Sequence, residues 1–330
     1  MAVYVNTNYS ALQGQRYLGN VQNSLTTTYQ RLSSGMRINS AKDDAAGLQI
    51  ADRLTSQING LNQGNRNAAD GIALAQTVEA GMDEISGMLQ KLRTLTVQAA
   101  NGTNTKEDRA ALSKEASALA TEINRIATQT TFAGKKVLNG KGDDSILGPA
   151  GNAGGGGNGQ NGTAGKAGDT GTLTLQVGSN KGDIISFDLQ SVMFSKLTGK
   201  ADDLIKAGTD KVFGTDQNTG AVTVTFTKAN FADQTAKDGI GSVIELMDKA
   251  IATVDGMRAD LGAIQNRLES SIRNQSNVAA NEADARSRIR DADFAEESAN
   301  LSQQSIIQQA AASMLMQANT RPQLGLSLLG

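Results

Sequence analysis

The chain has 330 residues, 38% of them hydrophobic and 3% aromatic, with no cysteine, no histidine and a formal net charge of −2. The missing side chains exclude disulfides, thiol chemistry, Ser-His-Asp triads and histidine-bound zinc, and the near-neutral charge provides no basic field for nucleic acid. This hydrophobic content is low for one compact globular domain and favours an elongated packing of thin helices.

A first helix is predicted near the N-terminus, where residues 1–30 carry a single charged side chain, Arg16. An exposed helix normally carries charge, so an uncharged polar helix suggests that most of its faces end up against protein. The segment has neither a basic start nor a continuous apolar run, and we therefore expect no cleaved secretory signal. Its thin apolar stripe consists of Ala11, Leu18, Val21, Leu25 and Leu32.

Two longer helices are predicted next, because apolar residues alternate at spacings of four and three, as in the seam of a coiled coil. Asn101-Gly102 indicates the end of the first, and the segment from Thr105 to Asp108 predicts a capping box that opens the second. The stripes are Leu74, Val78, Gly81, Ile85, Met88, Leu92, Leu95 and Ala99, followed by Leu112, Ala116, Leu119, Ile123, Ile126 and Thr130.

The middle of the chain changes character. Glycine recurs at nearly every third position in 148–171, which suits a flexible linker or a polyproline-II segment. Apolar residues alternate at period two on both sides of 178–182, which predicts a β-hairpin. Residues 222–226 suggest a further strand, within a small α/β insertion expected over 193–238.

The C-terminal third is again helical in pattern. A helix roughly 70 Å long is predicted over about 240–288, where no strong breaker occurs. Residues 298–320 carry no charge, but eight Asn, Gln and Ser residues between Asn300 and Ser313 argue against a membrane span. The two charge-poor ends predict a subunit that is completed only by assembly. The stripe of the long helix is Ile244, Met247, Ile251, Val254, Arg258, Leu261, Gln265, Leu268 and Ile272.

No catalytic, metal or cofactor site is expected. The glycines of 154–159 match a dinucleotide-binding pattern but do not lie between a strand and a helix. Residues 42–44 are typical of a solvated turn or helix start. One acidic group could bind a cation, but it lacks a loop glycine and the ligand periodicity of calcium loops, which favours a charged helix start; it consists of Asp291, Asp293, Glu296 and Glu297.

Several ordered segments at both ends of the chain resemble the signatures of bacterial flagellin. They cover, with the intervening matches, roughly 1–140, 172–190 and 240–330. The segments are QRLSSGMRINSAKDDAAGL at 30–48, LQVG at 175–178, ADLGAIQNRL at 259–268, SRIRDADFAE at 287–296 and MLMQAN at 314–319.

The resemblance implies a non-enzymatic structural subunit that self-assembles into the helical flagellar filament used for swimming, and that is secreted to the cell exterior. The implied fold is mainly α, with long antiparallel helices, a terminal coiled coil and a small β-hairpin/α+β outer insertion. The implied domains are a terminal-helix inner domain of 1–42 with 290–330, a helical rod of 43–147, 172–192 and 239–289, the Gly-rich segment 148–171, and an outward insertion of 193–238.

In this family the terminal segments are disordered in the free monomer and fold on assembly. The residues support this independently, because a weakly apolar helix cannot offset its ordering entropy alone. The expected self-assembly residues are Leu18, Val21, Leu25, Leu32, Leu301, Ile307, Met314 and Leu315. The expected rod core consists of Leu74, Ile85, Leu92, Leu119, Ile123, Ile251, Leu261 and Leu268.

The resemblance also implies partners: further copies of the chain, the flagellar export apparatus, an export chaperone at the C-terminal helix, and filament cap and hook-junction proteins. No nucleic-acid or membrane partner is expected. A host innate-immune receptor is implied for the first rod helices, although Lys91 and Thr94 depart from the Arg and Glu common there, and Leu95 also belongs to the seam. The matching positions are Gln90, Arg93, Leu95, Val97, Gln98 and Glu115.

Three other functions are compatible with parts of the sequence. A flagellin-like hook–filament junction protein shares the terminal helices and is separated by whether the protein polymerises alone. A secreted enzyme on a flagellin scaffold is disfavoured by the absence of histidine and cysteine. An adhesin would use 148–238, and ligand binding by that region would support it.

Overall fold

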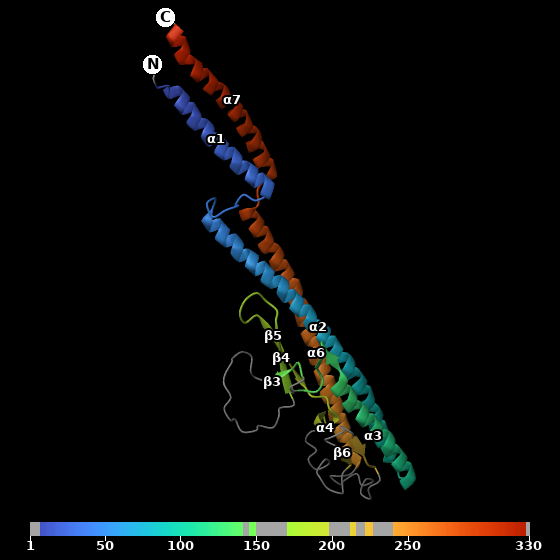
Figure 1. The fold of residues 1–330 in the computed structure, drawn as a ribbon. Coiled ribbons are helices and arrows are strands. Elements are labelled where there is room, and N and C mark those ends of the chain that lie inside the picture. The colour runs from blue at the N-terminus through green and yellow to red at the C-terminus, as the bar shows by residue number, and fades with distance from the viewer. Residues whose placement is uncertain are drawn as a thin grey trace, which may run out of the picture. The chain divides into compact units, whose positions relative to one another are not determined.

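The computed structural model describes residues 7–140, 145–149, 170–197, 212–215, 222–226 and 240–327. The chain divides into two compact units, residues 1–60 with 277–330 and residues 61–276. Two long helices, α2 (Ala45–Ala99) and α6 (Ile240–Arg290), contribute one part to each unit (Figure 1). The first unit is longer than the predicted inner domain of 1–42 with 290–330, so the functional domain boundaries stay a prediction.

The first unit is dominated by α1 (Tyr9–Ser34) and α7 (Phe294–Ser327), which run side by side (Figure 1). The side chain of Asn8 caps the start of α1 by accepting a hydrogen bond from the backbone N–H of Ala11 at 3.1 Å. Gly35, with φ 70°, ends α1 in the left-handed conformation that glycine adopts without steric cost. Within the described residues, the charge-poor ends predicted to be helical are therefore helical.

The connectors next to these two helices are held together by backbone hydrogen bonds. Met36 and Asp291 form an isolated antiparallel bridge. The N–H of Arg37 donates to the carbonyl of Arg290 at 2.7 Å, and that of Ala292 donates to the carbonyl of Gly35 at 3.0 Å. The segment that leaves α1 is thus tied to the segment that enters α7.

The second unit has a core shared by α2, α3 (Lys106–Gln129), α6 and the hairpin strands (Figure 1). The predicted capping box is confirmed, because Thr105 and Asp108 bond each other's backbone N–H at the start of α3. The predicted unbroken helix is confirmed as α6, which has 51 residues. Both local signals were sufficient to place these helix boundaries.

The buried stripe of α2 is broader than the predicted coiled-coil seam. Met82 and Leu89 lie outside that seam and are fully buried, whereas Gly81 and Met88 inside it are only half-buried. A two-stranded coiled coil covers one narrow stripe of a helix, but α2 contributes to a core that also contains α3, α6 and the hairpin. The helix therefore buries more than one face, and the predicted seam is part of a broader buried stripe.

The predicted hairpin is confirmed as β4 (Thr170–Gln176) and β5 (Ile184–Gln190), which pair antiparallel with Leu173 opposite Phe187. A short strand, β3 (Gly148–Pro149), pairs with the other edge of β4. A separate pair, β1 (Thr131–Phe132) and β2 (Lys135–Lys136), follows α3. Residues 150–169, which hold most of the Gly-rich tract, lie outside the described residues.

Two glycines of α2 let the hairpin approach the helix closely. A Cβ atom at Gly64 would overlap the carbonyl oxygen of Val177, and one at Gly71 would overlap the side chain of Leu175. The side-chain amide of Asn67 donates to the carbonyl of Gln176 at 2.9 Å and holds the same contact from the side. These two glycines, seven residues apart on one face of α2, form the surface on which the hairpin packs, called its seat below.

Within the insertion the structure describes residues 193–197, 212–215 and 222–226, which contain α4 (Phe194–Leu197), β6 (Phe213–Thr215) and β7 (Val222–Val224). The rest of 193–238 lies outside the described residues. The predicted strand at 222–226 is confirmed as β7, which pairs antiparallel with β6. On its other side β7 lies along α3 and bonds to helix hydroxyls. The backbone N–H groups of Val222, Val224 and Phe226 donate to Thr121, Ser117 and Ser113 respectively, at 3.3, 2.8 and 2.8 Å.

Candidate self-assembly surface

The helix pair α1–α7 buries little of itself. Within α1, 26 residues long, Thr28 is the buried residue, whereas α3 with 24 residues buries six. On α7 the buried side chains among those described are Glu297 and Ala311. Because apolar burial is the main favourable term in helix packing, this pair is weakly held within one copy of the chain.

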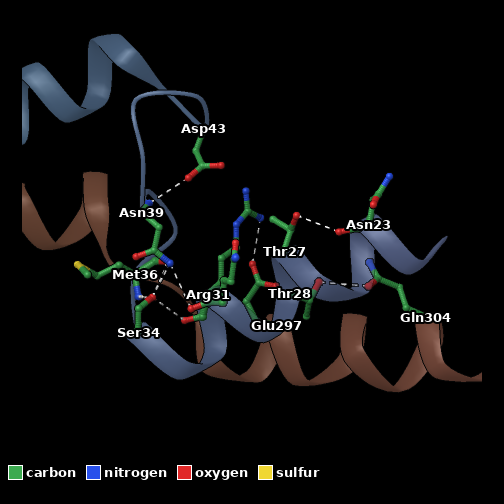
Figure 2. A network of polar contacts seen from close by, with 11 residues as sticks. Asn23, Thr27, Thr28, Arg31, Ser34, Met36, Asn39, Asp43, Glu297 and Gln304 are labelled. Atoms are coloured by element: carbon green, nitrogen blue, oxygen red, sulfur yellow. Dashed lines mark hydrogen bonds and ion pairs between the residues drawn. The ribbon is translucent and has the colours of Figure 1, made fainter. Parts of the chain in front are cut away.

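Polar contacts fix how the two helices are aligned (Figure 2). The Arg31 guanidinium bonds the buried Glu297 carboxylate at 3.2 Å. One turn away, the Thr28 hydroxyl donates to the side-chain oxygen of Gln304 at 3.3 Å. At the far end, the Asn8 side chain donates to the carbonyl of Ala318 at 2.7 Å. These contacts set the register of α1 against α7 without supplying much apolar burial.

The exposed apolar side chains concentrate on the same two helices. Among the described residues, every large apolar side chain that is more than half exposed belongs to α1 or α7. The most exposed are Tyr9 at 74%, Met314 at 70%, Met316 at 67% and Ile306 at 66%. An open groove of about 710 Å³ lies between the helices, lined by residues that include Gly14, Tyr17, Ile307 and Met314. Exposed apolar side chains on helices with so few charges are typical of surfaces that contact other proteins.

The expected self-assembly residues divide into two groups in this unit. Met314 is exposed and lines the groove. The others are half-buried along α1 and α7, where they contribute to the pair within one copy; they are Leu18, Val21, Leu25, Leu32, Leu301, Ile307 and Leu315.

Several exposed apolar residues of α1 and α7 lie off the predicted stripes. Tyr9, Tyr17, Ile306 and Met316 are more than half exposed and were not singled out. The signal that could have found them is an apolar or aromatic side chain on the polar side of a helix with very few charged side chains, because such a side is not specified for contact with water.

The expected rod-core residues lie in the second unit. Six are buried in its core, namely Leu74, Ile85, Leu92, Ile123, Leu261 and Leu268. Leu119 and Ile251 are half-buried and pack against that core. On α3 the buried residues are mostly small, Ser113, Ala116, Ala120 and Ala127 among them.

The expected receptor positions are not equally accessible. Leu95 is only 8% exposed and belongs to the core, whereas Gln90, Val97, Gln98 and Glu115 are exposed. Arg93 is ion-paired with Asp248 of α6, with Nε 2.5 Å from the carboxylate oxygen, and this pairing raises the pKa of Arg93. A ligand that used Arg93 would have to compete with that carboxylate.

Two members of the acidic group at 291–297, Asp293 and Glu297, have defined partners in the structure. The Asp293 side chain accepts hydrogen bonds from the backbone N–H of Ala295 at 2.8 Å and of Glu296 at 3.3 Å, and Glu297 pairs with Arg31. Within the described residues no cluster of acidic side chains suits a metal ion. None of the helices in the described ranges has the length and hydropathy needed to cross a bilayer.

Two family models match the parts of the chain that form the long helices. The model of the bacterial flagellin N-terminal helical region matches residues 5–143, and that of the C-terminal helical region matches residues 244–329. Flagellin D of Vibrio anguillarum is 39% identical over 100% of both chains. Flagellin A of Vibrio cholerae serotype O1 is 38% identical, again over 100% of both chains.

This chain belongs to the bacterial flagellin family. It is therefore a secreted structural subunit that polymerises with copies of itself in the extracellular flagellar filament. The polar flagellin C of Vibrio parahaemolyticus, 38% identical over the full length of both chains, agrees with this membership. The mainly α fold expected from the flagellin signatures is confirmed.

Solved structures resemble parts of the chain. Bacillus cereus flagellin is 23% identical, with a TM-score of 0.43, over 66% of this chain and 94% of that chain. A flagellar hook-associated protein of Vibrio parahaemolyticus is 17% identical, with a TM-score of 0.49, over 76% of this chain and 100% of that chain. The full-length relatives, which are flagellins, support the filament subunit over the hook–filament junction protein.

Proposed function

We propose that α1 and α7 are the surfaces through which copies of this flagellin contact one another in the filament. One observation carries the proposal: the most exposed apolar side chains of the described residues lie on these helices, which bury almost nothing within one copy. Burying a large apolar side chain contributes roughly 1.5–3 kcal/mol, and sister copies are the partners that a homopolymer provides. Identical copies joined by unlike patches without closure form an open helical polymer.

The exposed residues of α7 point in more than one direction. Met314 and Met316 are two residues apart, which is about 200° of rotation around a helix. Met314 lines the groove beside α1, and Met316 therefore lies on a different face. A helix that exposes apolar groups on two faces can contact more than one neighbour, as packing inside a filament requires.

The assignments of domains, rod core and bacterial partners are taken from the flagellin family and from where the matching residues lie in the chain. Residues 1–42 with 290–330 act as the inner domain, 43–147 with 172–192 and 239–289 as the rod, and 193–238 as an outward insertion. The rod-core residues hold the rod, and the chain has no enzymatic activity. The export apparatus, an export chaperone at the C-terminal helix, and cap and hook-junction proteins are its proposed bacterial partners.

A host innate-immune receptor is proposed to contact the exposed members of the expected surface, Gln90, Val97, Gln98 and Glu115. Their exposure in the second unit supports this contact. Leu95 contributes through packing, because it is buried. Binding of purified receptor ectodomain to Gln98→Ala and Glu115→Ala variants tests the proposal, and unchanged affinity in both variants would refute it.

The proposed contact is tested by removing residues 301–330 and by placing one charge on its surface. We expect the truncation to abolish polymerisation while the rod stays folded. We expect Ile306→Lys also to block polymerisation, because a lysine would have to be desolvated at the contact.

Ile184→Lys is the matched control, since Ile184 is an exposed isoleucine of β5 outside α1 and α7. Circular dichroism checks folding, and seeded growth followed by electron microscopy measures polymerisation. Normal filaments from the truncation, or from Ile306→Lys, would disprove the proposal.

A further inference from the structure

We propose that Met314 and Met316 form an oxidation site that controls assembly: a peroxide converts their thioethers to sulfoxides in the free subunit and thereby weakens polymerisation. This inference rests on the proposed role of α1 and α7 and adds its regulation. The occupant of the surface is a second copy of this chain, as the homopolymer demands.

Exposure separates these two methionines from the others that the structure describes. Their exposed fractions are 70% and 67%, whereas Met82 and Met247 have none and Met257 has 9%. Met36, Met88 and Met193 are half-buried. Oxidation of methionine follows the access of the oxidant to sulfur. Peroxide is therefore expected to modify Met314 and Met316 first.

The surroundings of the two thioethers explain why their oxidation would weaken the contact between copies. Residues 298–320 carry no charged side chain. Met314 lines the groove with Gly14, Tyr17 and Ile307 and is the longest flexible apolar side chain of α7 in that lining. The groove lining has no charged side chain, so a sulfoxide covered by another copy would have no charged donor there and would have to share the neutral polar groups of Ser10, Gln13 and Gln317.

The chemical step is a two-electron oxidation by hydrogen peroxide. A sulfur lone pair attacks one peroxide oxygen, an S–O bond forms and the O–O bond breaks. The second oxygen leaves as water, which carries away both protons, so the sulfur is oxidised and the peroxide is reduced. A methionine sulfoxide reductase reverses the change with two electrons from a dithiol.

The sulfoxide opposes assembly because its oxygen is a strong hydrogen-bond acceptor. In the free subunit water satisfies it, but in the filament it would be desolvated without a designed partner. Every subunit carries two such groups, and we expect the critical concentration for polymerisation to rise about tenfold. In filaments the same thioethers are covered, so oxidation there should be slow.

The test treats depolymerised full-length subunits with hydrogen peroxide, maps sulfoxides by peptide mass spectrometry and measures seeded polymerisation by sedimentation. We expect Met314 and Met316 to be modified before Met82 and Met247, polymerisation to weaken, and reductase treatment to restore it. Filaments treated alongside should retain unmodified Met314 and Met316.

The double variant Met314→Leu/Met316→Leu is the matched control, since leucine and methionine have similar volume. It should polymerise normally with or without peroxide. If peroxide weakens this variant too, another methionine is responsible and the inference fails. Oxidised wild-type subunits that polymerise normally would also overturn it, whereas normal filaments from Ile306→Lys would refute the proposed function instead. Should the double variant itself polymerise poorly, the reductase rescue and the difference between free and assembled subunits still decide the question.

Discussion

Gly64 shows how one missing side chain positions a whole hairpin. Its Cβ would overlap a backbone carbonyl, that of Val177, which cannot rotate away as a flexible side chain could. Gly64 lies within α2, where glycine lowers helix stability relative to alanine. The close approach of the hairpin offsets that loss.

We predict that Gly64→Ala destabilises the second unit by about 1–3 kcal/mol, because the hairpin must shift away from α2. Gly87→Ala is the matched control: Gly87 lies in the same helix, and a Cβ there would meet nothing within 4 Å. That change should stabilise by up to about 1 kcal/mol. Urea unfolding of both variants measures the difference, and equal effects would show that the overlap is relieved without cost.

Asp108 is the second residue whose local chemistry is testable. Hydrogen bonds from the backbone N–H and the hydroxyl of Thr105 lower the pKa of Asp108. A carboxyl with a lower pKa in the folded state stabilises that state above its unfolded pKa, and the contribution is lost as pH falls through the folded value. The start of α3 should therefore loosen below about pH 4.

The loosening is measured by following the backbone amide signals of Thr105 and Asp108 in NMR spectra from about pH 6 to pH 2. Asp108→Asn serves as the comparison, because the side-chain amide of asparagine does not titrate. The backbone amide signals of this variant at positions 105 and 108 should therefore stay unchanged with pH. Amide signals in the wild-type protein that do not change over this range would contradict the role of the carboxylate.

At the scale of elements, three hydrogen bonds join backbone N–H groups of residues 222–226 to side-chain hydroxyls of α3, and we call this set the hydroxyl ladder. The ladder explains how an insertion far along the chain is attached to the rod. Four residues of helix advance about 6 Å and two residues of strand about 6.6 Å. Hydroxyls at 113, 117 and 121 therefore meet alternate N–H groups of the antiparallel strand. The Ser117 hydroxyl donates to its own helix and still accepts from Val224.

We predict that Ser117→Ala loosens β7 from α3 at a cost of about 1–3 kcal/mol, since the Val224 N–H loses this acceptor in a buried place. Thr128→Ala is the control, because the Thr128 hydroxyl bonds only carbonyls of its own helix among the contacts described. Hydrogen exchange at 222–226 should accelerate in Ser117→Ala and stay unchanged in Thr128→Ala. Equal exchange in both variants would show that the ladder does not hold the strand.

At the scale of the whole molecule, stability is expected to be uneven between the two units. The second unit has a continuous core with fully buried residues from three long helices, whereas α1 and α7 share almost none. Helices with little burial cannot offset their conformational entropy in one copy of the chain. Assembly supplies the missing burial.

We predict that α1 and α7 exchange their amide hydrogens rapidly in dilute subunits and slowly in filaments, while α3 is protected in both. Hydrogen exchange with mass spectrometry measures this, and peptides of α3 act as the internal control. Strong protection of α1 and α7 in isolated subunits would mean that one copy orders its own ends.

The sequence alone determined which long segments are helical, where α3 begins, where the hairpin lies and that both ends are poor in charge. These properties depend on neighbours within a few residues, and periodicity and capping patterns report such neighbours directly. The stripe residues of α1 and α7 followed from the same periodicity, but the exposed Tyr17, Ile306 and Met316 did not.

The tertiary structure decided what covers each face. Leu95 belongs both to the predicted seam and to the expected receptor positions. Only the packing of the folded chain showed that it lies in the core. The seat at Gly64, the ladder at Ser117 and the second buried face of α2 each join residues that are far apart along the chain. Spacing in a sequence reveals that a helix has an apolar or small-residue face, but the free energy of that face depends on the element that packs on it, which only the folded chain supplies.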